Sequence, residues 1–165
     1  MAHETFIEYK QSGFWIPESY IEVLSHFICN AFLKSDLHNF NENLVKIYKN
    51  CDSNTSGINA GMVTILFDAY IIEPNEINTM INVLQDTKKI IAALGSQLSI
   101  KYLNDLEEKK EDDYFKVSWS FPIQTQSLIS TLNFMIQLLN ESFPQENIEV
   151  HYAGFPGMST SYITV

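Results

Sequence analysis

YLNDLEEKKEDDYFKVSWSF, residues 102–121, joins the most acidic part of the chain to its most regularly alternating part. Six carboxylates and two lysines fall within 105–113, a net charge of −4 in a chain whose total is −10. In the run that follows, Val117, Trp119 and Phe121 occupy every second position. Such alternation predicts a half-buried strand, so we expect these three side chains in the core. A segment that prefers water is thus tied to an element of the protein interior.

The composition is that of a globular protein. Of the 165 residues, 45% are hydrophobic and 18% are charged, which suits a sizeable core and is too apolar for a disordered chain. The chain contains no apolar run of about eighteen residues, so no membrane span is expected. MAHETFIEYK, at 1–10, lacks the basic and apolar segments of a secretory signal. We therefore expect one domain over 1–165, located in the cytoplasm.

The basic residues are all of one type, because the ten cations are lysines and arginine is absent from the sequence. Arginine is the usual residue for bidentate phosphate recognition. Binding to nucleic acid or to an anionic membrane requires a positive surface, so direct binding to either is disfavoured. An acidic protein is better suited to a basic protein partner.

The first half of the chain predicts two strands, two helices and a loop. Pro17 suits a helix start because it lacks the amide that would have no partner there, and Glu18 meets the positive helix end. GMVTILFDAYII predicts a buried strand, although periodicity cannot distinguish a continuous apolar run from a helix. In chain order, the expected elements are a strand at 4–10, helices at 17–34 and 41–50, a polar loop at 52–57 and the buried strand at 61–72.

The second half predicts two more helices and up to three strands. Residues 98–106 fit either a first hairpin arm or a helix that continues towards the acidic run. The expected elements are a helix from 73 to about 95, the strand at 115–121, a helix at 126–142, a strand at 148–152 and a last strand in SYITV at 161–165. This order predicts an α+β fold, a single domain with a mixed β-sheet and about four helices packed on it.

Motifs for catalysis are absent from the sequence. It contains no Walker A loop, no GxGxxG, no nucleophile elbow and no metal-ligand spacing. His26 and Cys29 lie three residues apart on a predicted helix and could form a Cys–His pair. No third residue is positioned to orient them, so a helix-packing pair is the preferred interpretation, and Cys29 and Cys51 are expected as buried thiols. We assign no catalytic residue, no metal and no cofactor.

The acidic run has two possible interpretations. A charge run is often a solvated surface that keeps a protein soluble. It can also form a docking surface, on which neighbouring aromatic side chains supply the apolar contacts that charge alone does not. The candidate partner-binding residues are Glu107, Glu108, Glu111, Asp112, Asp113, Tyr102 and Tyr114.

In general character the whole chain resembles bacterial toxin-immunity proteins, such as those paired with contact-dependent growth inhibition toxins. It shares their small size, acidity, mixed α and β character and lack of a catalytic motif. The resemblance implies a cytoplasmic antitoxin, not an enzyme, that binds one cognate basic toxin, often a nuclease, and neutralises it. The alternatives are an acidic secretion chaperone, expected to be a homodimer, another protein-binding adaptor, a nucleic-acid mimic, and an enzyme with scattered active-site residues.

Overall fold

An N-terminal hairpin supplies two of the three described strands of the main sheet, with the second strand of the hairpin in the middle. The computed structural model describes residues 3–58, 62–144, 150–151, 159–160 and 162–164. Strand β1 (Glu4–Tyr9) pairs with β2 (Ser12–Pro17) through a two-residue turn, Lys10 and Gln11, in which both φ angles are positive, as a type I′ turn requires. Strand β7 (Tyr162–Thr164) pairs with the other edge of β2. The strands predicted at the two ends of the chain are thereby confirmed.

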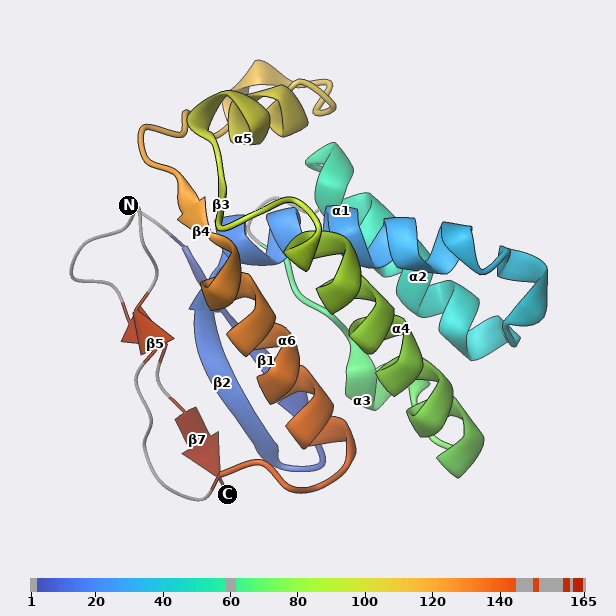
Figure 1. Cartoon of the computed structure of the whole chain (residues 1–165). Helices are drawn as coiled ribbons and strands as arrows, with labels where there is room; N and C mark the ends of the chain where they lie inside the picture. Colours follow the sequence, from blue (N-terminus) through green and yellow to red (C-terminus); the bar gives the residue numbers. More distant parts are fainter. Residues whose placement is uncertain (1–2, 59–61, 145–149, 152–158, 161, 165) are drawn as a thin grey trace.

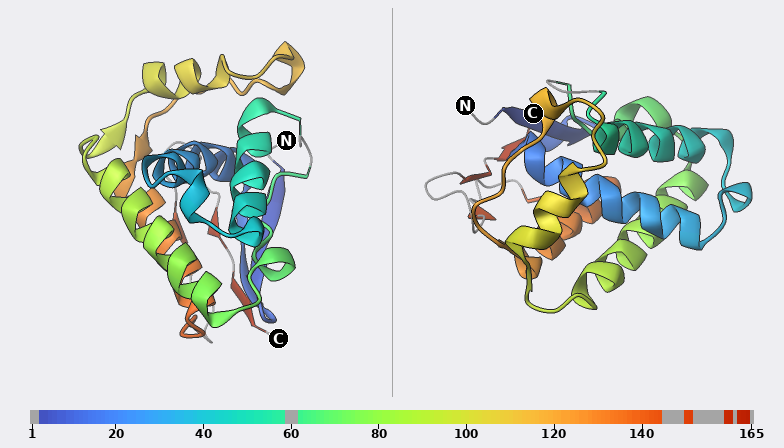
Figure 2. Two further views of the ribbon diagram at one scale, coloured as in Figure 1. Left: turned by 90° about the vertical axis from the view of Figure 1, so that its right-hand side faces the viewer. Right: turned by 90° about the horizontal axis from the view of Figure 1, so that it is seen from above.

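Four long helices enclose the core beside this sheet. Helix α6 (Thr125–Leu139) lies over the β1–β2 hairpin, α4 (Pro74–Ala92) lies beside α6, and α1 (Glu18–Lys34) contacts α4 and α2 (Glu42–Ser56) (Figures 1 and 2). The largest fully buried side chains are Tyr9, Tyr20, Phe14, Phe27, Phe32 and Phe67. The core is therefore one contiguous apolar cluster shared by the hairpin and the helices.

Helix α2 continues through the segment that was predicted to be a loop. Its polar residues are helical because they find partners inside the fold. The Asn54 amide donates to Ser25 Oγ at 3.2 Å and to the Thr64 carbonyl at 2.9 Å. Gly57, with φ of +79°, then ends the helix in the left-handed conformation that glycine adopts readily. The prediction of a loop at 52–57 is therefore wrong.

The strand predicted at 61–72 is also wrong. Residues 62–66 have no strand partner, and α3 (Phe67–Tyr70) follows them. Val63 and Ile65 are buried, which accounts for the apolar pattern. The backbone of this segment bonds to side chains instead of to a strand. Asn50 donates to the Thr64 carbonyl at 3.1 Å and accepts from the Leu66 amide at 3.0 Å.

The remaining elements confirm the α+β class but not a mixed sheet. Helices α4 and α6 lie where they were predicted, and the last turn expected of α6 is not helical. All described strand pairs are antiparallel, including β3 (Gln97–Leu98) with β4 (Ile123–Gln124) and β5 (Val150–His151) with β6 (Ser159–Thr160). Strands joined by a tight turn, as β1 and β2 are, must run antiparallel. Positions 148, 149 and 152 of the strand predicted there lie outside the described residues.

Two helices add to the four that were predicted, namely α3 and α5 (Ile100–Glu107). The helical alternative for 98–106 is therefore correct for most of that segment. None of the helices in the described ranges is both long enough and apolar enough to cross a membrane.

Glu76 stabilises the start of α4. Its buried carboxylate accepts hydrogen bonds from the backbone amides of Ile72 and Glu73 and from the side chains of Asn41 and Asn43, at 2.8–3.0 Å. The backbone bonds are the main cause that lowers its pKa to about 2. Because the folded pKa is depressed, the stabilisation is present above the ordinary value of 4.5 and is lost as the pH falls towards 2.

We expect Glu76→Gln to lower the free energy of unfolding by about 1–2 kcal/mol at pH 7, because the charged acceptor is lost. The difference from wild type should shrink as the pH approaches 2. Urea denaturation at pH 7 and pH 3 measures both values, and an equal loss at the two pH values would contradict this account.

Candidate functional site

The candidate site is a projecting segment between β3 and β4, residues 99–121, which we call the arm. It lies at the top of Figure 1 and of the left view of Figure 2, above the body of the protein; in the right view, seen from above, it lies across the body. Ser99 caps α5 by accepting from the Tyr102 amide at 3.1 Å. After α5 the chain turns, and Asp112 caps the short helix η2 (Asp113–Phe115) by accepting from the Tyr114 amide at 2.9 Å. Residues 116–121 then return to β4.

The returning segment bonds to side chains of α5 and not to a strand. Asn104 accepts from the Trp119 amide at 2.9 Å and donates to the Trp119 carbonyl at 3.1 Å. Glu107, one turn further along the same helical face, accepts from the Val117 amide at 3.0 Å. Asn104 thus pairs with Trp119 and Glu107 with Val117, so the returning chain runs antiparallel to α5.

This arrangement corrects the strand predicted at 115–121. The alternating pattern is real, because Trp119 is 4% exposed and Val117 is half-buried. Phe121, however, is 49% exposed, so its predicted burial is wrong. The segment does not join a sheet among the described residues; on the side that faces α5, side chains of Asn104 and Glu107 bind the backbone where a strand would otherwise pair.

A buried ion cluster fastens the arm to the body. The Lys110 ammonium is 2.6 Å from a Glu107 carboxylate oxygen, is paired with Glu22 of α1, and donates to the Phe115 carbonyl at 3.0 Å. The indole Nε1 of Trp119 donates to the other Glu107 oxygen at 3.1 Å. Lys110, Glu107 and Glu22 are each less than a tenth exposed. Two carboxylates share one ammonium, so the cluster carries a net negative charge when both are ionised.

Aromatic contacts reinforce this attachment. Tyr102 of α5 stacks on Phe27 of α1, with ring centroids 6.3 Å apart and planes 2° from parallel. Trp119 meets Tyr20 of α1 edge-on at 6.1 Å. Such pairs contribute about 0.5–1.5 kcal/mol beyond the area they bury. The base of the arm is therefore a packed interface with α1.

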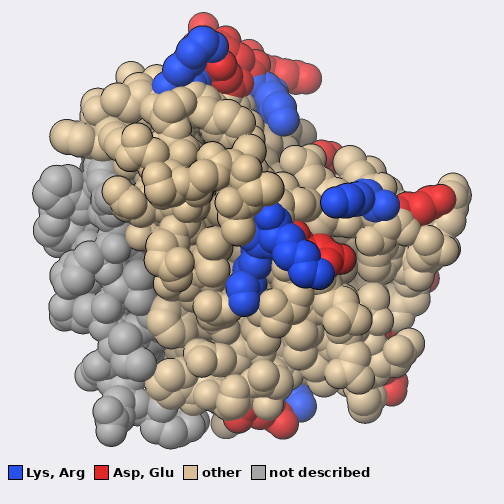
Figure 3. All heavy atoms as spheres, viewed as in Figure 1, with Lys and Arg blue, Asp and Glu red and all other residues tan. Residues whose placement is uncertain are grey.

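The predicted partner-binding residues fall into two groups. Glu107 and Tyr102 belong to the attachment just described, so the structure does not bring them to the open surface. The other five lie exposed at the outer end of the arm, where Tyr114 is 86% exposed: Glu108, Glu111, Asp112, Asp113 and Tyr114. Figure 3 shows charged side chains gathered over the arm at the top of the view.

Two further aromatic residues of the arm are exposed: Phe115, which the sequence places at the edge of the acidic run as a possible apolar contact, and Phe121, whose exposure the sequence analysis missed. Phe115 is 38% exposed and packs edge-on against Tyr114 at 5.1 Å, and Phe121 is exposed at the other end of the returning segment. The alternating pattern favoured an inward Phe121, so no sequence signal indicated its exposure. We call the exposed part of the arm, comprising 108, 111–115 and 121, the acidic–aromatic surface.

The negative charge of this surface is partly compensated. Lys116 lies 2.7 Å from Asp113 and 3.1 Å from Glu108. Its hydrogen bond lowers the pKa of Asp113 below the ordinary value. No ion pair involves Glu111 or Asp112 among the residues that the structure describes. The strongest uncompensated charge therefore lies at 111–112.

The ionisable groups of α1 beside the cluster are strongly perturbed. Burial raises the pKa of Glu22 to about 7, against the opposing effect of Lys110. Burial, together with Lys109 and Lys110, lowers the pKa of His26 to about 4. Burial also raises the pKa of Cys29 to about 12, so this residue is a thiol and not a thiolate nucleophile at neutral pH. Cys29 and Cys51 are both buried and free, as predicted.

Glu22 and His26 give opposite pH dependences of stability. The raised pKa of Glu22 gives stability that is present below 4.5 and lost as the pH rises through about 7. The lowered pKa of His26 gives stability that is present above 6.5 and lost as the pH falls towards 4. Between pH 4.5 and 6.5 the stability lost through Glu22 as the pH rises is nearly offset by the stability gained through His26.

In the Glu22→Gln variant, the pH dependence of stability should therefore be that of His26 alone. The variant should gain stability as the pH rises from about 4 to 6.5, and at pH 8 it should exceed wild type by up to about 3 kcal/mol. Urea unfolding from pH 4 to pH 9 measures this difference. Parallel curves for variant and wild type would contradict the assignment of a raised pKa to Glu22.

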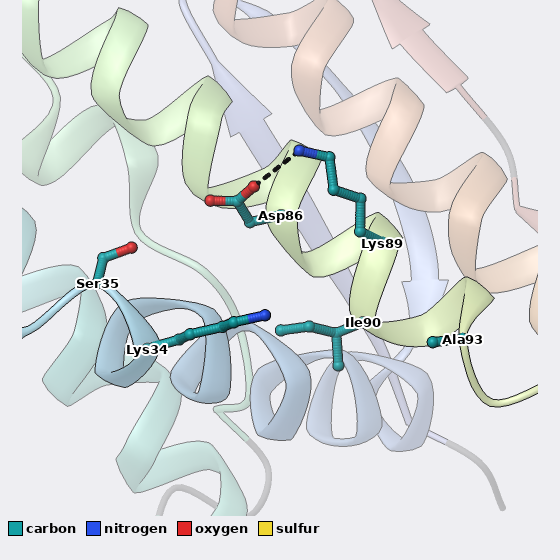
Figure 4. Close-up of a pocket in the computed structure, with 6 residues that line it drawn as sticks. All are labelled: Lys34, Ser35, Asp86, Lys89, Ile90 and Ala93. Carbon is teal, nitrogen blue, oxygen red and sulfur yellow. Dashed lines mark hydrogen bonds and ion pairs between the residues drawn. The ribbon is translucent and has the colours of Figure 1, made fainter.

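A second surface feature is an open pocket of about 600 Å³ beside the C-terminal ends of α1 and α4. Asp86 and Lys89 pair at 3.2 Å along one side of it (Figure 4). Its lining residues are Lys34, Ser35, Asp86, Lys89, Ile90 and Ala93. In the described part of the chain, no group of His, Cys, Asp and Glu side chains could hold a metal ion. The pocket therefore offers less distinctive chemistry than the arm.

Comparisons with known proteins found no match to a family model, to a curated protein or to a solved structure. The candidate function has to be argued from the residues of this chain.

Proposed function

We propose that this protein is a bacterial immunity protein that acts in the cytoplasm, where it binds a cognate basic toxin and neutralises it without turnover of its own. The observation that carries the proposal is the acidic–aromatic surface, which combines uncompensated carboxylates with exposed aromatic rings on a firmly attached arm. Charge would attract the partner, and the rings would supply the apolar contacts.

The attachment of the arm supports this role. A surface that is already ordered loses little conformational entropy on binding. Glu111 and Asp112 lie one to two residues beyond Lys110, whose side chain is fixed by the buried cluster. Tyr114 is held through its own amide by Asp112 and through its ring by Phe115. Tyrosine is one of the residues most often found to dominate interface energetics.

A nuclease is the kind of toxin that fits best. Proteins that act on nucleic acids carry a positive surface that contacts phosphates. An acidic surface that covers this region would compete with the substrate, and complementary charge would speed encounter between the two proteins.

Charge reversal tests this proposal. We expect Glu111→Lys/Asp112→Lys to slow association with the proposed basic toxin by about tenfold or more at low salt, because steering charges act mainly on the encounter rate. The difference should fade as salt rises and the Debye length falls below about 10 Å. Stopped-flow association at several salt concentrations, with growth protection in parallel, gives the readout.

The matched control is Glu8→Lys/Glu42→Lys, which changes the net charge equally at exposed positions on β1 and at the start of α2. It should associate at close to the wild-type rate. Equal slowing by both pairs would show that only total charge matters, and wild-type behaviour of the arm variant would place the interface elsewhere.

A further inference from the structure

The returning segment of the arm has one bonded edge and one open edge. In an extended chain the backbone groups of successive residues point to opposite edges. The Val117 and Trp119 amides bond to α5, so those of Ser118 and Ser120 point away from it. Both serines are exposed, and neither has a hydrogen bond within the described ranges. Within 116–121, Ser118 and Ser120 therefore present unpaired backbone donors and acceptors to the outside, whereas the Lys116 amide bonds to the Asp113 carbonyl at 3.2 Å.

An open edge of this kind is a template for strand addition. Main-chain hydrogen bonds to an added strand give affinity, and the flanking side chains decide which segment is accepted. Natural proteins usually protect such edges from pairing with copies of themselves by keeping them short and by placing lysine or proline on them. Here Lys116 and Pro122 bound the edge, while the small side chains of Ser118 and Ser120 leave its middle accessible.

The surroundings of the edge indicate the chemistry of the segment that would bind. Glu111 and Asp112, which lack an ion-pair partner among the described residues, lie at its N-terminal end. Exposed aromatic rings lie at both ends, Tyr114 at one and Phe121 at the other. A strand that carries alternating cationic and apolar side chains would match both features.

We infer that the open edge of the arm, residues 116–121, binds an extended lysine- or arginine-bearing segment of the partner protein by strand addition. This inference rests on the proposed function, in which the arm receives a basic protein. It adds that recognition is made through the backbone at Ser118 and Ser120 as well as through side-chain charge.

Amide hydrogen exchange of the full chain tests this inference. The probe is a capped eight-residue peptide of alternating lysine and valine. In the free protein, the Val117 and Trp119 amides should exchange slowly and the Ser118 and Ser120 amides rapidly. With nine-tenths of the protein bound to peptide, exchange at Ser118 and Ser120 should slow by about tenfold, because it then proceeds from the free fraction.

Two variants and a modified peptide separate backbone from side-chain recognition. Ser118→Pro/Ser120→Pro removes two outward amides and leaves the bonded amides of Val117 and Trp119 in place, and proline favours the extended conformation in the residue before it. We expect this variant to weaken peptide binding by about tenfold or more, whereas Ser118→Ala/Ser120→Ala should bind like wild type. Methylating the peptide amides should weaken binding without any change to the protein.

The outcomes are distinguishable. If the peptide slows amide exchange at Glu111 and Asp112 but not at Ser118 and Ser120, strand addition is overturned and the proposed function stands. If the peptide changes amide exchange nowhere on the arm, the result counts against both strand addition and the proposed function. Protection at Ser118 and Ser120 that needs no peptide and grows with protein concentration would show that the edge pairs with a second copy of this chain, which would overturn the choice of a basic partner.

Discussion

Lys110→Ala is expected to lower the free energy of unfolding by about 3–5 kcal/mol, the usual cost of removing one partner from a buried ion pair. The variant would leave the Glu22 and Glu107 carboxylates and the Phe115 carbonyl without their shared donor. The loss should be smaller at pH 5 than at pH 8, because burial has already raised the pKa of Glu22 to about 7 and protonation removes its charge. Urea denaturation at the two pH values measures the difference.

The neighbouring lysine provides a matched control. Lys109 is exposed, and Lys109→Ala removes the same charge one residue away without disturbing the buried cluster. Its effect should stay within about 0.5 kcal/mol, as for most surface changes. Similar losses for Lys109→Ala and Lys110→Ala would mean that the cluster does not fasten the arm.

Trp119→Ala should cost about 3–5 kcal/mol, the range for truncating a buried large aromatic side chain. Trp119 is 4% exposed, packs against Tyr20 of α1 and donates its indole hydrogen to Glu107. Its loss would therefore open a cavity and leave a buried carboxylate oxygen without a donor. Thermal and urea unfolding both report the change.

Phe121→Ala is the comparison for this variant, because Phe121 belongs to the same alternating run but is 49% exposed. We expect a change below about 1 kcal/mol. If Phe121→Ala lowers the free energy of unfolding strongly and Trp119→Ala only slightly, then Phe121 and not Trp119 is the buried residue of the returning segment.

The two strands that were predicted wrongly share a physical cause. Both segments bury alternate apolar residues, Val63 and Ile65 in one and Trp119 in the other. The continuous apolar run at 61–72 and the alternation at 115–121 both indicate burial, but neither pattern reports what binds the backbone. In this fold, asparagine side chains of a neighbouring helix take the place of a strand partner, from Asn50 on α2 and Asn104 on α5.

The helices were more predictable, because their apolar stripes and end signals act locally. Pro74 and the capping box of Glu73 and Glu76 start α4 where the sequence indicates. The error at 52–57 came from polar residues, Asn54 among them, whose partners on other segments could not be known beforehand.

The candidate site was predictable only where local sequence decides exposure. Exposure of Glu111, Asp112 and Tyr114 follows from their polarity and their place at a chain reversal. The burial of Glu107 and Lys110 does not, because charged residues are seldom buried unless paired, and Glu22 lies 88 residues away from Lys110. Only the tertiary fold identifies that partner.

The most direct test of the central claim is hydrogen exchange of the whole chain with and without the basic toxin proposed as its partner. If the arm receives the toxin, amides within 108–121 should become protected on binding, while those of α4, beside the open pocket, should keep their free rates. Protection that appears over α4 while the arm exchanges as in the free protein would contradict the assignment of the arm as the docking surface.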